Sequence, residues 1–348
     1  MKKFLQLFVA IMCVTSLLIT ACSSGNGSNK AGSDGGSGQN AAPIKLSLGT
    51  INTSDSVDGQ AAVKFKELVE KNSNGKLQVD IFHNSQLGPT MTQIEGTMLG
   101  TQDMILAGME LYEKWAPDLK ILSVFYVFDN DEHFNKFFQS SIFANIQKQL
   151  EENNIKWINQ KFNWVTGPYR VLATTKPVEK LEDLQGMKLR MPEVETLQRS
   201  WKHLGAVPVT ISWGETYLAL KQNIVAGLEA PVSIIRPNKF PEVTKYITEV
   251  RTFPQRMGLA MNLQKLNSLP ADLQTVLFNA ADEAGEYYTS IVEKAAKDDL
   301  EAMKKEDNVQ YFQPDLKPWK EKMKPFIYQL EQEGYLRKGL YDEIQALK

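Results

Sequence analysis

Two arginines interrupt apolar, strand-like segments near the middle of the chain. Arg190 lies in the segment MKLRMP (187–192), and Arg170 lies in YRVL (169–172). Side chains of an extended segment alternate between two faces, so Arg190 points away from its apolar neighbours. A guanidinium keeps its charge, and its planar donors match a carboxylate. If both strands end at one cleft, the two arginines predict an anion site. The alternative is a solvated or ion-paired arginine on an edge strand, which the pattern favours for Arg170.

The remaining chemical inventory offers no standard catalytic or metal-binding motif. The only histidines, His83, His133 and His203, lie far apart without paired acidic or cysteine spacing, so no metal site is predicted. The segment DNDE (129–132) resembles the start of a calcium loop but lacks its glycine and distal glutamate, which favours a helix N-cap. No G-x-S-x-G elbow, phosphate-binding glycine-rich loop or H-E-x-x-H motif occurs. We therefore predict no metal, no cofactor and no enzymatic activity.

The start of the chain resembles a lipoprotein signal peptide. Two lysines precede an apolar stretch (4–19), and ITAC (19–22) places small residues before a cysteine. This resemblance implies a signal peptide over 1–21, cleavage before Cys22 and lipid attachment to its thiol. The only other cysteine is Cys13, inside the signal, so no disulfide is predicted. A retained transmembrane helix is the alternative, because the apolar stretch is almost long enough to span a bilayer.

Composition divides the rest of the chain into a tether and a globular part. Residues 22–42 are almost entirely Gly, Ser, Asn and Ala, which predicts a flexible linker with a reach of about 25 Å. Residues 43–348 exceed the size at which one hydrophobic core usually stops growing, so two lobes are expected. The formal charge of the whole chain is −2 and no basic tract occurs, which argues against nucleic acid.

Strand-like and helix-like spacings alternate in both halves of the globular part. Residues 44–48 and 77–81 have strand spacing with a helical segment between them, so the sheet should be partly parallel, with ligand at the carboxyl ends of its strands. The segment NWVTGP (163–168) separates the two sets of alternating strand-like and helix-like spacings. It predicts a hinge where the chain crosses from one lobe to the other. A long helix is predicted to begin near 268–270 and to reach 305, about 50 Å, which is long enough to back both lobes. These patterns predict an α/β, two-lobed fold.

Several segments resemble the solute-binding proteins of TRAP (tripartite ATP-independent periplasmic) transporters. That family captures small carboxylates outside the cell and hands them to a membrane permease. The similarity covers most of 43–256. The segments that carry it are LGT (48–50), NSQLG (84–88), KLRMP (188–192), WGETYLAL (213–220), GLEAP (227–231) and KFPEVTKY (239–246).

The resemblance implies a periplasmic-binding-protein-like fold with hinge strands and a long helix that backs both lobes. Lobe I would comprise 43–165 and 254–295, and lobe II would comprise 166–253. The C-terminal helices in 296–348 would pack on lobe II.

The resemblance also implies roles for individual residues. Arg190 matches the arginine that forms the main salt bridge to the ligand carboxylate, and Arg170 matches an assisting cation in the preceding strand. Trp213 occupies an aromatic position whose flat face packs on the ligand's carbon skeleton. Tyr217, one helical turn further on, is a weaker candidate because it can simply be core. The predicted ligand-contacting positions are Arg190, Arg170, Trp213, Glu193, Tyr217 and Ala230.

Two departures from the family pattern bear on the solute. Many relatives have an asparagine that reaches the ligand where this chain has Ala230. Some present an acidic ligand contact near Ala107–Gly108, which this sequence lacks. Both departures argue against sialic acid and favour a different organic acid.

The combined interpretation is an extracytoplasmic protein on the outer face of the cell membrane, anchored through lipid on Cys22. It would bind a small carboxylate between the lobes and deliver it to TRAP-type permease subunits. Two alternatives stay open. One is a sensory lipoprotein with the same pocket, and the other is an enzyme acting on acidic sugars, with Glu215 or Glu229 as acid or base.

Overall fold

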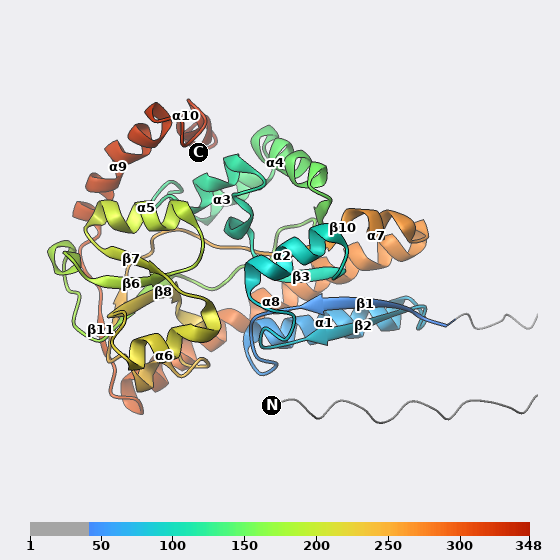
Figure 1. Cartoon of the computed structure of the whole chain (residues 1–348), viewed down its shortest axis with the longest axis horizontal. Helices are drawn as coiled ribbons and strands as arrows, with labels where there is room; N and C mark the ends of the chain where they lie inside the picture. The colour runs from blue at the N-terminus through green and yellow to red at the C-terminus, as the bar shows by residue number, and fades with distance from the viewer. Residues whose placement is uncertain (1–41) are drawn as a thin grey trace, which may run out of the picture. The chain divides into compact units, whose positions relative to one another are not determined.

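The computed structural model describes residues 42–348, which form one compact unit. The predicted signal peptide, Cys22 and nearly all of the linker lie outside these residues. Two mixed β-sheets organise the described chain (Figure 1). Helices of 6 to 35 residues cover them, so the predicted α/β class is confirmed.

The first sheet has the strand order β2-β1-β3-β10-β4. Strand β1 runs parallel to β2 and β3, whereas β10 is antiparallel to β3 and β4. The chain thus returns to this sheet, through β10, after forming strands β5 to β9 of the second one. The strands are β1 (Ile44–Gly49), β2 (Leu77–Phe82), β3 (Met104–Gly108), β4 (Ile155–Trp157) and β10 (Met257–Asn262).

Capping residues and apolar spacing explain the helices that accompany the first sheet. Helix α1 (Val57–Asn72) begins where the Ser56 hydroxyl accepts a hydrogen bond from the Gly59 amide, and it buries Phe65. Helix α2 (Thr90–Leu99) ends at Gly100, whose φ of 77° closes the helix in the left-handed region. The short helix α7 (Leu263–Ser268) follows β10.

The second sheet has the order β11-β9-β5-β8-β6-β7. Strand β6 is parallel to β7 and β8, and β5 is antiparallel to β8 and β9. Helices α5 (Glu195–Leu204) and α6 (Thr216–Lys221) connect its strands. The strands are β5 (Arg170–Thr174), β6 (Lys188–Met191), β7 (Val207–Thr210), β8 (Gly227–Pro231), β9 (Tyr246–Glu249) and β11 (Gln310–Phe312).

The predicted long helix is present as α8 (Ala271–Lys305), of 35 residues. Its first part buries apolar residues against α1 and the first sheet, and Ala296 and Met303 belong to the core of the second sheet. The crossing segment is fixed to α8 because the Trp164 indole nitrogen donates to the Ala281 carbonyl at 2.8 Å. Gly285 permits this approach, since a Cβ there would collide with the Trp164 ring. One helix therefore backs both sheets, as predicted.

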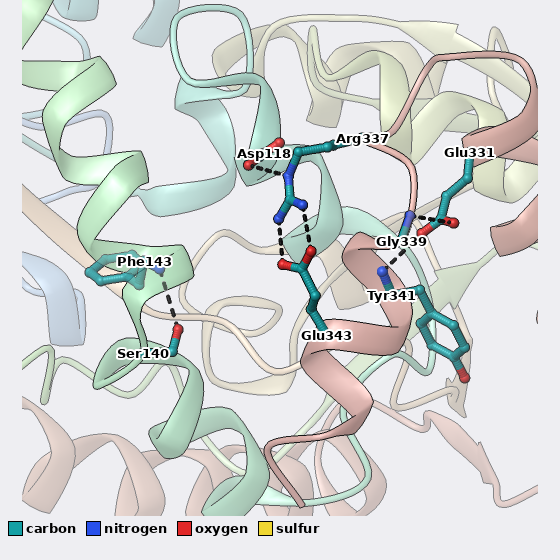
Figure 2. A network of polar contacts seen from close by, with 8 residues as sticks. All are labelled: Asp118, Ser140, Phe143, Glu331, Arg337, Gly339, Tyr341 and Glu343. Carbon is teal, nitrogen blue, oxygen red and sulfur yellow. Dashed lines mark hydrogen bonds and ion pairs between the residues drawn. The ribbon is translucent and has the colours of Figure 1, made fainter.

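Between β3 and β4 the chain forms two 3-10 turns, η1 (Met109–Tyr112) and η2 (Pro117–Ser123), and helices α3 (Asp131–Phe138) and α4 (Ser141–Glu152). The C-terminal helices α9 (Lys317–Gln332) and α10 (Leu340–Gln345) pack both on α5 and on this region. Arg337 donates to Asp118 at 3.1 Å and to both carboxylate oxygens of Glu343 at 2.7 Å; Figure 2 shows these contacts. The C-terminal helices thus contact parts of both proposed lobes.

The helices of residues 42–348 include none that is both long enough and apolar enough to cross a membrane. The same residues contain no cluster of three or more His, Cys, Asp or Glu that could hold a metal ion.

Candidate functional site

A cleft of about 110 Å³ lies between the carboxyl ends of strands from both sheets. Ile51 follows β1, Gly108 ends β3, Pro192 follows β6 and Pro231 ends β8; all four line the cleft. This is where ligands bind in open α/β sheets, because the loops that follow parallel strands converge there. Its lining brings together four of the six predicted contact residues: Arg190, Arg170, Trp213 and Ala230.

Arg190 is a buried cation without a partner anion. It is 6% exposed, its Nε donates to the Ile211 carbonyl at 2.8 Å, and its guanidinium lies 5.3 Å from the Trp213 ring centre. Within residues 42–348 no carboxylate forms an ion pair with it. Burial and the nearby charge of Arg170 lower the pKa of Arg190 to about 9, so it remains charged at neutral pH. Since an isolated buried charge is costly, an anion in this cleft would be strongly favoured.

Arg170 lines the same cleft, but its donors are already used. Its Nε and Nη2 donate to the two oxygens of Glu229, the latter at 2.8 Å, and its Nη1 donates to Gln255 Oε1 at 2.6 Å. Thr252 completes the group by donating to Glu229 at 2.8 Å. The charge of Arg170 is balanced by Glu229, so the ion-paired alternative that the pattern favoured describes this arginine. A direct role of Arg170 toward the ligand stays a prediction.

Trp213 and Ala230 form walls of the cleft. The Trp213 ring packs edge-on against Phe240 at 5.3 Å, and its nitrogen donates to Asn238 at 3.2 Å, which fixes one ring face toward Arg190. Ala230 is 1% exposed and offers only a methyl group. The cleft thus has an aromatic surface but no amide at position 230.

Glu193 and Tyr217 do not line this cleft. Glu193 is exposed just beyond β6, where the chain turns to solvent before α5. Tyr217 donates its hydroxyl to Glu242 at 2.6 Å on the protein surface. Helical spacing from Trp213 does not extend to Tyr217, because Trp213 belongs to a separate 3-10 turn (Trp213–Glu215) that precedes α6.

Glu110 is a cleft residue that the sequence analysis missed. It lies in η1, directly after β3, and accepts a hydrogen bond from Gln255 Nε2. Gly108 makes room for it, because a Cβ at that position would collide with the Glu110 carboxylate. The expectation that the chain lacks an acidic group near Ala107–Gly108 is therefore wrong. The sequence signal for this residue is a single acidic side chain in the otherwise apolar segment MILAGMEL (104–111).

Two carboxyl groups in the cleft have raised pKa values. Burial raises the pKa of Glu110 to about 6, against the opposing effect of the Arg170 charge. Burial also raises the pKa of Asp58 to about 6; Tyr288 lies beside it and Asn52 donates to it at 2.5 Å. Both groups are ionised above neutral pH at a cost in stability.

Replacing Asp58 by asparagine should flatten the dependence of stability on pH. A folded pKa above the unfolded value means that the folded state binds more protons between about pH 4 and 6, so stability falls as pH rises through that range. We expect this group to add about 1 kcal/mol to the free energy of unfolding between pH 7.5 and 5, and Asp58→Asn to lack that gain. Urea unfolding at the two pH values measures it.

Asp272→Asn is the matched control, because the Asp272 side chain is 67% exposed. It should leave the pH dependence of unfolding as in the wild type. An Asp58→Asn protein that gains as much stability on acidification as the wild type would show that Asp58 is already protonated or already solvated at pH 7.5.

A larger cavity of about 290 Å³ lies on the other side of Thr166, Arg170 and Gln255. Two of its charged residues pair within the protein, Arg251 with Glu249 and Asp129 with Lys348. It also contains Arg256, which is 4% exposed and forms no ion pair within residues 42–348. We assign the ligand site to the smaller cleft because it lies at the carboxyl ends of strands from both sheets and combines Arg190 with the Trp213 ring.

Comparisons with known proteins agree with this geometry. Residues 48–333 match the model of the bacterial extracellular solute-binding proteins, family 7. A solute-binding protein of Roseobacter denitrificans is 29% identical over 256 residues, which cover 74% of this chain and 78% of that protein. The C4-dicarboxylate-binding periplasmic protein of Rhodobacter capsulatus is 29% identical over 268 residues, which cover 76% of this chain and 78% of the relative.

Solved structures show the same fold. The TRAP periplasmic solute-binding protein of Ochrobacterium anthropi with bound L-fuconate aligns with a TM-score of 0.82 at 25% identity, over 88% of this chain and 99% of that chain. The Roseobacter denitrificans protein with bound L-galactonate aligns with a TM-score of 0.79 at 26% identity, over 87% and 98%. The family consists of solute-binding receptors, so the prediction that the protein is not an enzyme is confirmed and the acidic-sugar enzyme is set aside. The chain belongs to the bacterial extracellular solute-binding proteins of family 7, and its resemblance to the solute-binding proteins of TRAP transporters is confirmed.

Proposed function

We propose that this protein captures a small organic acid in the cleft between its two sheets, with the ligand carboxylate on Arg190. The observation that carries the proposal is the buried guanidinium of Arg190, which has no ion-pair partner within residues 42–348. A planar carboxylate would supply both the missing charge and two acceptors. L-Galactonate and L-fuconate, the ligands of the two related structures, are organic acids, which supports this choice.

Trp213 and Ala230 would contact the carbon skeleton of the ligand, and Arg170 would act indirectly by holding Glu229 and Gln255. We retain the lobe boundaries 43–165 with 254–295, and 166–253, as part of the proposal. The division of the strands between the two sheets supports these boundaries. The chain crosses between the sheets near Val165 and again near Arg256, and an isolated antiparallel bridge pairs these two residues. Closure about these segments would enclose the ligand.

Delivery to TRAP-type permease subunits and a lipid anchor at Cys22 complete the proposed function. The anchor depends on the sequence pattern ITAC (19–22) and on the Gly/Ser-rich linker that follows it. A sensory lipoprotein with the same pocket would differ only in its membrane partner.

A thermal-shift screen of residues 42–348 against small carboxylates tests the proposal. Hydroxy acids, sugar acids, dicarboxylates and aromatic acids are each paired with the uncharged amide or alcohol. A true ligand at a hundredfold excess over its dissociation constant should stabilise the protein by about 2.7 kcal/mol. An equal shift with acid and amide, or no shift with any acid, would remove the basis for carboxylate capture.

A further inference from the structure

The charged groups that line the cleft are unequal in number. Two are basic, Arg170 and Arg190, and three are acidic, Asp58, Glu110 and Glu229. Arg170 and Glu229 neutralise each other through two hydrogen bonds. What remains for a ligand is one cation, Arg190, and two carboxyl groups.

These remaining groups come from different sheets. Arg190 lies on β6 and faces Trp213, both in the part of the chain that forms the second sheet. Asp58 is in the first turn of α1 and Glu110 follows β3, both beside the first sheet. A ligand that spans the cleft therefore meets a guanidinium at one end and carboxyl groups at the other.

Gln255 holds the acidic end in place. It accepts a hydrogen bond from Arg170 at 2.6 Å and donates to Glu110, so a chain of hydrogen bonds runs from Glu229 through Arg170 and Gln255 to Glu110. The Glu110 carboxylate fills the space that a Cβ at residue 108 would occupy. These hydrogen bonds thus hold the Glu110 carboxylate in a defined position in the cleft.

We infer that Glu110, assisted by Asp58, makes the protein selective for hydroxylated monocarboxylates and excludes a second carboxylate from the cleft. This inference rests on the proposed function, because it requires the first carboxylate to lie on Arg190. An ionised carboxyl accepts hydrogen bonds but cannot donate them, so it would bind ligand hydroxyls. A second ligand carboxylate would meet a like charge in a desolvated site, which costs several powers of ten in affinity.

Acidification should weaken this selectivity. Burial raises the pKa of Glu110 and of Asp58 to about 6, so both begin to be neutralised below that pH. The charged groups that act on Glu110 are Arg170, which lowers its pKa, and Glu229, which raises it. Both belong to the same neutral pair, so the protonation of Glu110 itself should govern the change.

Matched acids that differ only at the far end provide the test. Glycerate and tartronate, threonate and tartrate, and galactonate and galactarate each share a carbon skeleton, with a terminal CH₂OH in the first and a carboxylate in the second. Titration calorimetry of residues 42–348 gives both dissociation constants at pH 7.5 and 5.5. If the ligand found in the screen is another acid, its oxidised dicarboxylate counterpart completes the pair.

We expect the monocarboxylate to bind about 100-fold or more tightly than its partner at pH 7.5, with the ratio falling about tenfold at pH 5.5. Glu110→Gln keeps the volume and the acceptor for Gln255, and should lower the ratio at pH 7.5 by about tenfold. Asp58→Asn should act in the same direction. Glu113→Gln is the control, because Glu113 is a buried carboxylate that accepts from the Thr196 amide at 3.2 Å and does not line the cleft.

The outcomes separate this inference from the proposed function. A wild-type protein that binds both members of a pair equally, or prefers the dicarboxylate, and loses that binding in Arg190→Ala, would overturn the inference and leave carboxylate capture intact. Unchanged selectivity in Glu110→Gln would overturn the role of Glu110. Binding that survives Arg190→Ala would overturn the proposed function, and the inference with it.

Discussion

Arg190→Ala should weaken binding of the ligand acid by roughly two to four orders of magnitude. Removing one partner of a desolvated ion pair typically costs about 3–5 kcal/mol, and each 1.4 kcal/mol is a factor of ten in the dissociation constant. Arg190 is 6% exposed and 5.3 Å from the Trp213 ring, so water cannot readily replace it around the ligand carboxylate. Titration calorimetry of the variant with the acid found in the screen measures the loss.

The unliganded variant should be at least as stable as the wild type. Arg190 has no ion-pair partner within residues 42–348, so its removal relieves an uncompensated buried charge, which offsets the loss of its hydrogen bond to the Ile211 carbonyl. Large loss of affinity without loss of stability is the signature of a ligand-binding charge. A variant that unfolds more easily and binds poorly would instead indicate a structural arginine.

Two further variants make the result specific. Arg190→Lys retains the charge but not the planar fork, so it should bind more weakly than the wild type and more tightly than the alanine variant. Arg199→Ala removes an arginine on α5 that pairs with Glu195 and Glu333 outside the cleft, and should leave affinity unchanged. Affinity retained in Arg190→Ala would show that another group binds the carboxylate.

Local pattern sufficed to predict the elements that carry the site. Arg190 was assigned to a strand because it alternates with apolar neighbours, and Lys188–Met191 is that strand. The long helix was predicted from its unbroken length after Pro270, and α8 runs for 35 residues. Both features depend on periodicity within one segment, which the sequence displays directly.

Pairing between distant segments was not predictable in the same way. Arg170 and Glu229 are brought together because β5 and β8 run antiparallel with Leu172 opposite Glu229, which places the two charged residues diagonally on one face. A shift of one residue in register would separate them. Sequence alone does not define that register, so the pattern could favour an ion-paired Arg170 without identifying Glu229 as its partner.

The position of the Glu110 carboxylate depends on Gly108, which has no side chain to block it. Nothing in the segment MILAGMEL (104–111) shows that the turn after β3 carries the carboxylate back across Gly108 toward Gln255. Glu193 and Tyr217, which the resemblance implied as ligand contacts, lie outside the cleft for a different reason. Glu193 follows the end of β6, and Tyr217 belongs to a different helical element from Trp213.

Glu229→Gln should strongly destabilise the protein. The side chains of Glu229 and Arg170 are 1% and 8% exposed, and the pair is joined by two hydrogen bonds. Glutamine keeps the size but leaves the Arg170 charge buried and unpaired. Such a loss typically costs about 3–5 kcal/mol, and urea unfolding at pH 7.5 should show it as a lower midpoint with an unchanged slope.

An exposed pair of the same chemistry is the control. Glu306 pairs with Arg236, and their side chains are 66% and 34% exposed. Solvent screens that interaction, so Glu306→Gln should cost about 0–1 kcal/mol. Glu229→Gln could instead cost no more stability than Glu306→Gln. Water or the neighbouring Gln255 would then compensate the buried charge of Arg170, and the cleft would be more hydrated than the burial of its side chains implies.

The same variant also tests the charge balance of the cleft. With Glu229 neutral, Arg170 adds a second uncompensated cation next to Arg190, while Glu110 keeps its place beside Gln255. Dicarboxylates should then gain affinity relative to monocarboxylates, opposite to the preference expected of the wild type. A destabilised Glu229→Gln protein whose selectivity is unchanged would mean that the pair supports the fold without influencing the ligand. A change in both would show that one buried ion pair stabilises the protein and also sets the charge that its ligand can carry.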